Sequence, residues 1–147
     1  MGALQISIAP PFQGKGLSSL FIEEMRQLAR RKGFSILIAP VRPNRKHLYP
    51  LSSIDSYASW SFPDGLPYDP WLRVHVRAGG RILKTCQSAM RIIGTVAEWE
   101  EWTGLRFFQT GQYIVPGALV PVVIDLAQDR GTYTEPGVWI VHDILKH

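Results

Sequence analysis

A proline pair and two glycines separate two patterned segments near the start of the chain. Residues Pro10 to Ser19 read "PPFQGKGLSS", after the alternating segment "ALQISIA" and before an amphipathic run. Proline cannot donate to a strand ladder, so Pro10 ends the strand. Glycine adopts the positive φ that tight turns require and lets other groups approach the backbone closely. The pattern therefore predicts a strand over residues 3–9, an exposed loop, and a helix that begins beside the loop.

The segments that follow the loop predict a crossover connection. Apolar residues recur at helical spacing from Leu17 to Lys32, and Gly33 is placed to end the helix. The run "FSILIAPV", which begins at Phe34, has the length of a strand and is almost continuously apolar, which predicts a strand buried on both faces of a sheet. A strand, a helix and a strand in this order form a right-handed crossover, so we expect the two strands to be parallel.

The loop also has a chemical use. Backbone N–H groups at the start of a helix have no intrahelical acceptor and lie at the positive end of the helix dipole. Because Gly14 and Gly16 have no Cβ, an anion such as a pyrophosphate can contact these groups, and Lys15 adds a charge at the rim. An ordinary glycine-rich turn explains the same residues. The segment matches neither the Walker sequence nor the dinucleotide-binding G-x-G-x-x-G.

The rest of the chain is less regular. Residues 42–68 hold four prolines and many aromatic residues, with one short helix expected over 52–60. Asp69 as N-cap and Pro70 at the first position open a helix that the glycines at 79–80 close. We expect later elements in this order: a strand in 81–86, a helix in 95–104 capped by threonine, and closing strands in "ALVPVVIDL", "GTYTE" and "GVWIVHDI", the first two forming a hairpin across "AQDRG".

The composition is that of one globular domain, which we expect to cover residues 1–147. The chain is 46% apolar and 19% charged, with a formal net charge of +4, which suits an anionic ligand but is too weak to indicate nucleic acid binding. No apolar run approaches the roughly 20 residues that span a bilayer, and no signal-peptide pattern opens the chain. The single cysteine, Cys86, fits a reducing compartment, so we expect a cytoplasmic protein without membrane partners. Cys86 and the four histidines form no close-spaced set, so no metal site is expected.

The segment "LQISIAPPFQGKGLSSLFIEEMRQLARRKGF" resembles the central part of the GNAT (GCN5-related) N-acetyltransferases. That family's signature is [R/Q]-x-x-G-x-[G/A] after a strand ending hydrophobic-x-Pro. Its six places are filled here by Gln13, Gly14, Lys15, Gly16, Leu17 and Ser18, with serine where glycine or alanine is usual. Ile8 falls where the family's strand offers backbone groups to pantetheine. The resemblance covers residues 3–41 well and 69–86 poorly.

The resemblance implies an α/β fold, a mixed sheet flanked by helices, with acetyl-CoA as cosubstrate and no metal. In the family the loop binds the pyrophosphate, and the pantetheine arm enters a gap where the next strand, here "FSILIAPV", splays away from strand 3–9. The residues then expected to contact the cofactor are Ile6, Ile8, Gln13, Gly14, Lys15, Gly16, Leu17, Ser18 and Ser19.

A weaker part of the resemblance concerns catalysis. Family members often carry N-x-x-A-x-x-L-Y-x-x-x-G-F, and aligning "WLRVHVRAGGRIL" by its glycine places His75 on the tyrosine that lies near the thioester sulfur. His75 is therefore the candidate acid at sulfur, although a helix histidine bonded to a carbonyl is the alternative. Gly80 and Tyr68 replace the family's phenylalanine and asparagine. Tyr49 and Tyr68 are candidates for acceptor binding, or aromatic residues that cover the core. No carboxylate stands out as a general base.

Two functions stay open: acetyl transfer from acetyl-CoA to a small-molecule or peptide amine, and a GNAT-like module that binds CoA or a partner protein without catalysis. The family's fold normally places three or more strands and two helices before the glycine loop, and those N-terminal strands are lacking here. Strand 3–9 would then present an apolar edge. The chain is a piece of a longer protein, or it pairs with a second copy or a separate N-terminal segment, or its last strands fold back over the edge. We favour a fragment or truncated member completed by self-association, for example as a homodimer.

Overall fold

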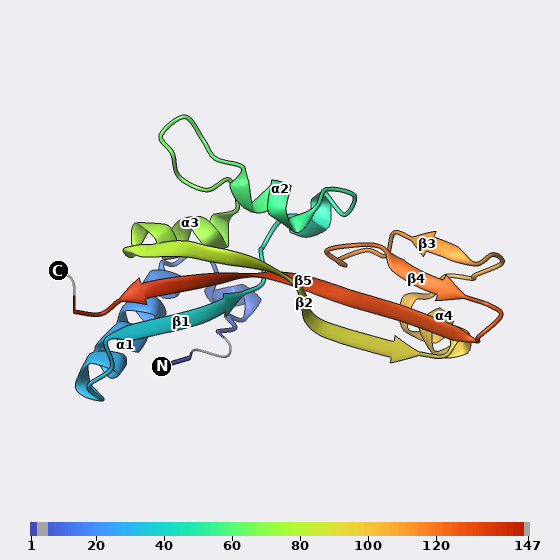
Figure 1. The fold of residues 1–147 in the computed structure, drawn as a ribbon, viewed down its shortest axis with the longest axis horizontal. Coiled ribbons are helices and arrows are strands. Elements are labelled where there is room, and N and C mark those ends of the chain that lie inside the picture. The colour runs from blue at the N-terminus through green and yellow to red at the C-terminus, as the bar shows by residue number, and fades with distance from the viewer. Residues whose placement is uncertain (3–5, 146–147) are drawn as a thin grey trace.

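The computed structural model describes residues 1–2 and 6–145. Figure 1 shows an elongated molecule in which one long strand, β5, runs through most of the length. In chain order, the elements are α1 (Leu17–Arg31), β1 (Ile36–Val41), α2 (Ile54–Ser59), α3 (Pro70–Arg77), β2 (Gly80–Gly94), α4 (Val96–Thr103), β3 (Gly111–Tyr113), β4 (Val122–Asp125) and β5 (Arg130–Asp143), with short 3-10 segments at Pro10–Phe12 and Lys46–Leu48. The expected mixed α/β fold, a sheet flanked by helices, is confirmed.

The sheet is organised around β5, and its named strands pair in the antiparallel sense. β2 pairs with one edge of β5 along most of its length. The opposite edge pairs with β1 at residues 138–143 and with β4 at residues 130–132, and β3 completes the sheet beyond β4. The predicted hairpin between β4 and β5 is therefore confirmed. Figure 1 shows α1 and α3 at one end of the molecule, and α4, β3 and β4 at the other.

The prediction of two separate closing strands in "GTYTE" and "GVWIVHDI" is wrong, because β5 is continuous through both. Pro136 joins them, and a proline N atom cannot donate to a ladder. The register between β2 and β5 shifts between Cys86 and Met90, so β2 offers Pro136 no opposite residue. An irregularity in the partner strand therefore allows the proline to stay inside a long strand.

β1 buries one face only. Leu37, Ala39 and Val41 are buried, whereas Ile36 is 42% exposed and Pro40 is exposed. The prediction of a strand covered on both faces is therefore wrong, since a continuous apolar run does not by itself show that a second layer is present. Leu37 packs against α1, and the other two buried residues join a core with residues of α2, α3 and β5.

The four helices predicted from the sequence are confirmed, and each has a capping device. Ser53 caps α2 through the Ser56 N–H, and Thr95 caps α4 in a capping box with Glu98. At the end of α1, Gly33 has a φ of 77°, and the N–H groups of residues 33 and 34 bond to carbonyls in the last turn, which forms a Schellman motif.

The start of the chain lies beside β1. Gly2 forms a parallel bridge with Ile38, and the Ile38 N–H donates to the Met1 carbonyl at 2.8 Å. This pair has the parallel sense expected of the crossover. Residues 3–5 of the expected strand 3–9 lie outside the described residues, and residues 6–9 form no strand. Whether a second copy or another segment covers this region stays a prediction.

A second core lies at the other end of the sheet, where α4, β3 and β4 pack together. It consists of Trp99, Phe107, Val122, Ile124 and Tyr133. Gly131 of β5 provides the close approach, because a Cβ there would lie 2.1 Å from the Trp99 ring. Within residues 1–2 and 6–145, none of the helices is both long and apolar enough to cross a membrane.

Candidate functional site

The glycine loop forms an exposed turn directly before α1. The segment Pro10–Phe12 makes one 3-10 turn, and the Gln13 side-chain amide donates to the Ile8 carbonyl at 2.9 Å. Gly14 and Gly16 have φ angles of 73° and 74°, which L side chains rarely adopt. The first backbone bond of α1 runs from the Leu20 N–H to the Gly16 carbonyl, so the preceding N–H groups of the helix start stay open for a ligand.

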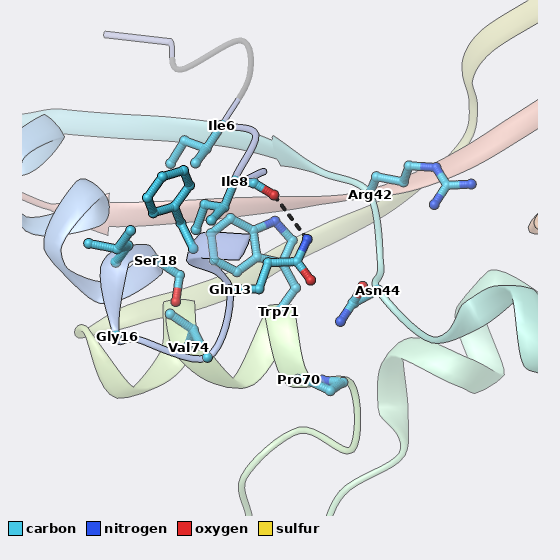
Figure 2. A pocket seen from close by; sticks show the side chains of 13 residues that line it. Ile6, Ile8, Gln13, Gly16, Ser18, Arg42, Asn44, Pro70, Trp71 and Val74 are labelled. Carbon is cyan, nitrogen blue, oxygen red and sulfur yellow. Dashed lines mark hydrogen bonds between the residues drawn. The ribbon is translucent and has the colours of Figure 1, made fainter. Parts of the chain in front are cut away.

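A cavity of about 510 Å³ opens beside this loop. Its wall includes the loop and the first turn of α1 on one side, and the first turns of α3 and the residues after β1 on the other. In Figure 2, Gly16 and Ser18 lie on one side of the cavity, Trp71 lies in its middle, and Arg42 and Asn44 lie opposite the loop. The volume falls within the roughly 300–1,000 Å³ of small-molecule pockets.

Seven of the nine residues predicted to contact a cofactor line this one cavity: Ile6, Ile8, Gln13, Gly14, Gly16, Leu17 and Ser18. Lys15 and Ser19 are exposed and lie outside its wall. The Lys15 ammonium instead lies 5.6 Å from the centre of the Phe12 ring. On the loop side, the lining thus combines the backbone of two glycines with the side chains of Ile6, Ile8, Gln13, Leu17 and Ser18.

Sequence reasoning missed the opposite wall, which consists of Arg42, Asn44, Pro70, Trp71 and Val74, and it also missed Phe12 on the loop side. Three of these residues belong to α3, whose start was predicted from Asp69 and Pro70. A signal for the wall was therefore present, since residues one turn apart at the start of a helix face the same side. The sequence did not indicate that this face of α3 meets the glycine loop.

His75 lies behind the cavity rather than in its wall. Only 2% of the residue is exposed, and it borders a small neighbouring space of about 30 Å³ together with Ile6 and Trp71. Its Nδ1 lies 3.0 Å from Nε2 of His142, which is fully buried. Burial, together with the charge of His142, lowers the pKa of His75 to about 4, so its imidazole is neutral at pH 7.

Tyr49 and Tyr68 are brought together, and their hydroxyl oxygens lie 2.9 Å apart. Neither belongs to the wall of the large cavity. Both rings belong to an aromatic cluster with Tyr57 and Trp60, whose ring centres lie 4.9 to 6.1 Å apart. This arrangement matches the alternative in which the tyrosines cover the core, and their predicted contact with an acceptor stays a prediction.

Comparison with known proteins supports the same fold. The chain matches no protein-family model. It is 31% identical over 162 residues to the arginine N-acetyltransferase avaD of Aspergillus versicolor, and the match covers 98% of this chain and 56% of that protein. The structure resembles the loading GNATL domain of CurA from Lyngbya majuscula with a TM-score of 0.59 and 20% identity, over 97% of this chain and 54% of that chain. The chain thus spans about half the length of these relatives.

Proposed function

Because this chain has a GNAT-like fold and its resemblance to the GNAT N-acetyltransferases is confirmed, we propose that it transfers an acetyl group from acetyl-CoA to an amine. The observation that carries this proposal is the cavity between the glycine loop and α3. One wall offers open N–H groups at a helix start, and the other offers apolar surface from Trp71 and Val74. A ligand with a charged diphosphate and a long uncharged arm matches both walls.

The residues that would hold acetyl-CoA follow from this division. The N–H groups from Gly14 to Ser18 would bind the diphosphate at the positive end of α1. Ile6 and Ile8 on one side and Trp71 on the other would contact the arm. Lys15 and Ser19, outside the wall, would contribute at most at the rim of the diphosphate site.

The proposed reaction exchanges one acyl bond for another. The amine nitrogen attacks the thioester carbonyl carbon, a C–N bond forms, and the C–S bond breaks. One proton leaves the amine, and one proton is taken up by the departing thiolate, which leaves an amide and free CoA. A protein group that gives or takes these protons must lie within hydrogen-bond reach of the reacting atoms.

The catalytic role of His75 stays a prediction, and the protonation state of its imidazole defines what that role would be. Because the imidazole is neutral at pH 7, it would donate its single N–H and not act as an imidazolium. Turnover by a folded His75→Asn variant at the wild-type rate would remove this role. A loss of turnover in the variant, with acetyl-CoA binding intact, would support it.

The proposed acceptor rests on the chemistry of the reaction and on the name of one similar protein. We propose a small molecule with a free amine, and L-arginine is the first compound to test because one similar protein is named as an arginine N-acetyltransferase. We also propose a cytoplasmic location, since the single cysteine suits a reducing compartment. We also propose that the chain forms a homodimer, and sedimentation analysis would test this.

The sharpest test of cofactor binding compares the two glycines that flank α1. Gly16 and Gly33 have φ angles of 74° and 77°, and a Cβ at either would meet no atom within 4 Å, but only Gly16 lines the cavity. Alanine at either position costs roughly 1–2 kcal/mol of folding free energy through backbone strain. We expect only Gly16→Ala to weaken acetyl-CoA binding, measured by titration calorimetry. Equal affinities for the two variants would contradict the placement of the diphosphate.

A second measurement separates an enzyme from a binding module. Release of free CoA thiol is followed with wild-type protein, acetyl-CoA and a panel of amines. Binding of acetyl-CoA without amine-dependent thiol release would leave the non-catalytic module as the function. If no binding is detected at millimolar acetyl-CoA, neither function holds.

A further inference from the structure

A second cavity, of about 360 Å³, lies where the sheet bends between its two halves. We call it the sheet-bend pocket and define it by Arg42 after β1, by Cys86 and Ala89 of β2, and by Glu135 and Trp139 of β5. It forms at the register shift between Cys86 and Met90, where the residues between them have no partner in β5. The structure therefore makes room for a small molecule at the one place where β2 and β5 come out of register over several residues.

One ion pair provides the charged part of this pocket. The Arg42 Nε donates to a carboxylate oxygen of Glu135 at 2.9 Å, and the other oxygen accepts a bond of 2.7 Å from the Tyr133 hydroxyl. The side chain of Glu135 is 10% exposed, and that of Arg42 is 50% exposed. Arg42 also donates from one Nη to the Gly117 carbonyl at 3.0 Å. The pair is thus fixed in place before any ligand arrives.

Both members keep bonding capacity for a ligand. A guanidinium has five N–H donors, and the two contacts to Glu135 and Gly117 leave three of them within the described structure. A carboxylate has about four acceptor positions, of which Arg42 and Tyr133 take two. The positive charge of Arg42 would repel a ligand that carries only an ammonium group. The negative charge of Glu135 would repel a ligand that carries only a carboxylate. A ligand that carries both charges matches the pair best.

The sheet-bend pocket adjoins the large cavity. Arg42 belongs to the walls of both, and Pro40 and Val41 of β1 border the pocket on one side and the small space in front of His75 on the other. The end of β1 therefore separates the sheet-bend pocket from the small space beside His75, and Arg42 borders both the pocket and the large cavity. A molecule bound to Arg42 therefore lies at the boundary between the sheet-bend pocket and the large cavity.

We propose that the sheet-bend pocket binds the acceptor and that the acceptor is a free amino acid held as a zwitterion. Arg42 takes the α-carboxylate, Glu135 takes the α-ammonium group, and the surface around Trp139 contacts the side chain. This inference rests on the proposed acetyltransferase function and names the acceptor class of the same site.

The kinetic test compares each amino acid with its decarboxylated counterpart, beginning with L-arginine against agmatine. We expect kcat/KM for the amino acid to be higher by on the order of 10- to 100-fold, as one charged hydrogen-bonded contact gives. Arg42→Gln should remove this preference, and Glu135→Gln should raise KM for both amines of a pair. Asp143→Asn is the control, because its ion pair with Arg81 lies at the exposed end of the sheet. Equal kcat/KM values for amino acid and counterpart in the wild type, or a preference that survives in Arg42→Gln, would overturn the proposal.

A second readout does not depend on turnover. Cys86 is the chain's single cysteine and lines the pocket, so its alkylation by iodoacetamide reports occupancy. We expect L-arginine to slow alkylation several-fold and agmatine to have little effect at the same concentration. If the thiol proves unreactive, alkylation of Ala89→Cys in a Cys86→Ser background replaces this measurement. Unchanged labelling at a concentration of L-arginine that saturates turnover would overturn the proposal.

Calorimetry with acetyl-CoA on the same proteins keeps the two proposals apart. Failure of the wild type to bind acetyl-CoA contradicts the proposed function. Binding and turnover without protection of the labelled thiol contradicts the sheet-bend pocket alone.

Discussion

Replacing Asp69 tests how the start of α3 is held against the cavity. The residue is 1% exposed, and its side chain accepts four hydrogen bonds. One carboxylate oxygen accepts from the Trp71 and Leu72 N–H groups at 3.0 and 3.2 Å. The other accepts from the Tyr57 hydroxyl at 2.6 Å and the Arg45 N–H at 2.9 Å. Asp69 therefore joins the N-cap of α3 to α2 and to the loop after β1.

The expected loss of stability follows from those bonds. Asp69→Ala removes the N-cap, which costs about 1 kcal/mol, and leaves the buried Tyr57 hydroxyl and the Arg45 N–H without their acceptor, at about 1–3 kcal/mol for the more buried group. We expect a total of about 2–4 kcal/mol. Asp69→Asn keeps one oxygen for the cap, but its NH₂ group then faces the Arg45 donor. We therefore expect it to lower the free energy of unfolding by about 1–2 kcal/mol.

Urea unfolding followed by tryptophan fluorescence measures the effect, because the Trp60 ring lies 5.1 Å from the Tyr57 ring. Asp64→Ala is the matched control, since Asp64 accepts a single bond, from the Leu66 N–H, in an exposed turn. We expect it to change the free energy of unfolding by less than about 0.5 kcal/mol. A loss below about 1 kcal/mol for Asp69→Ala, or equal losses for the alanine and asparagine variants, would refute the reasoning.

Three further substitutions or conditions have defined outcomes. Gly131→Ala should destabilise the second core by about 1–3 kcal/mol in urea, because the new Cβ displaces the Trp99 ring. Lys46→Met should cost about 1–3 kcal/mol in the same assay, since the fully buried ammonium donates to two carbonyls that would lose their partner. Burial lowers the pKa of both His75 and His142 to about 4, so the unfolded chain binds more protons between pH 6.5 and 4, and stability should fall as pH drops through that window. A folded His75→Gln variant should show a shallower fall, and an unchanged slope would contradict the assignment.

The loop side of the cavity could be predicted because its residues lie in one stretch of chain. Gln13 to Ser18 follow one another, and their use depends on backbone conformation, which glycine and proline indicate directly. The opposite wall could not be predicted in this way. Trp71 and Arg42 lie 29 residues apart in the sequence, and only tertiary packing brings them to one cavity.

The errors in the fold have the same origin. Local signals located the helices well, since caps such as Ser53 and Asp69 act within a few residues. The continuity of β5 through Pro136 depends on an irregularity in β2, some 50 residues earlier, and the half-exposed β1 depends on which layers are present. Both properties depend on residues outside the segment from which they were predicted.

This contrast bears on how the two proposed sites respond to change. The diphosphate site uses N–H groups, so most side-chain substitutions there should leave binding intact unless they alter φ at Gly14 or Gly16. The sheet-bend pocket uses one ion pair whose members come from the end of β1 and from β5, and loss of either charge leaves the other partly buried and unpaired. Glu135 lines the sheet-bend pocket and not the large cavity, so its substitution should change acceptor binding and leave acetyl-CoA binding intact. A chain of this fold would then change its specificity at the bend of the sheet, without altering the loop that is proposed to hold the acyl donor.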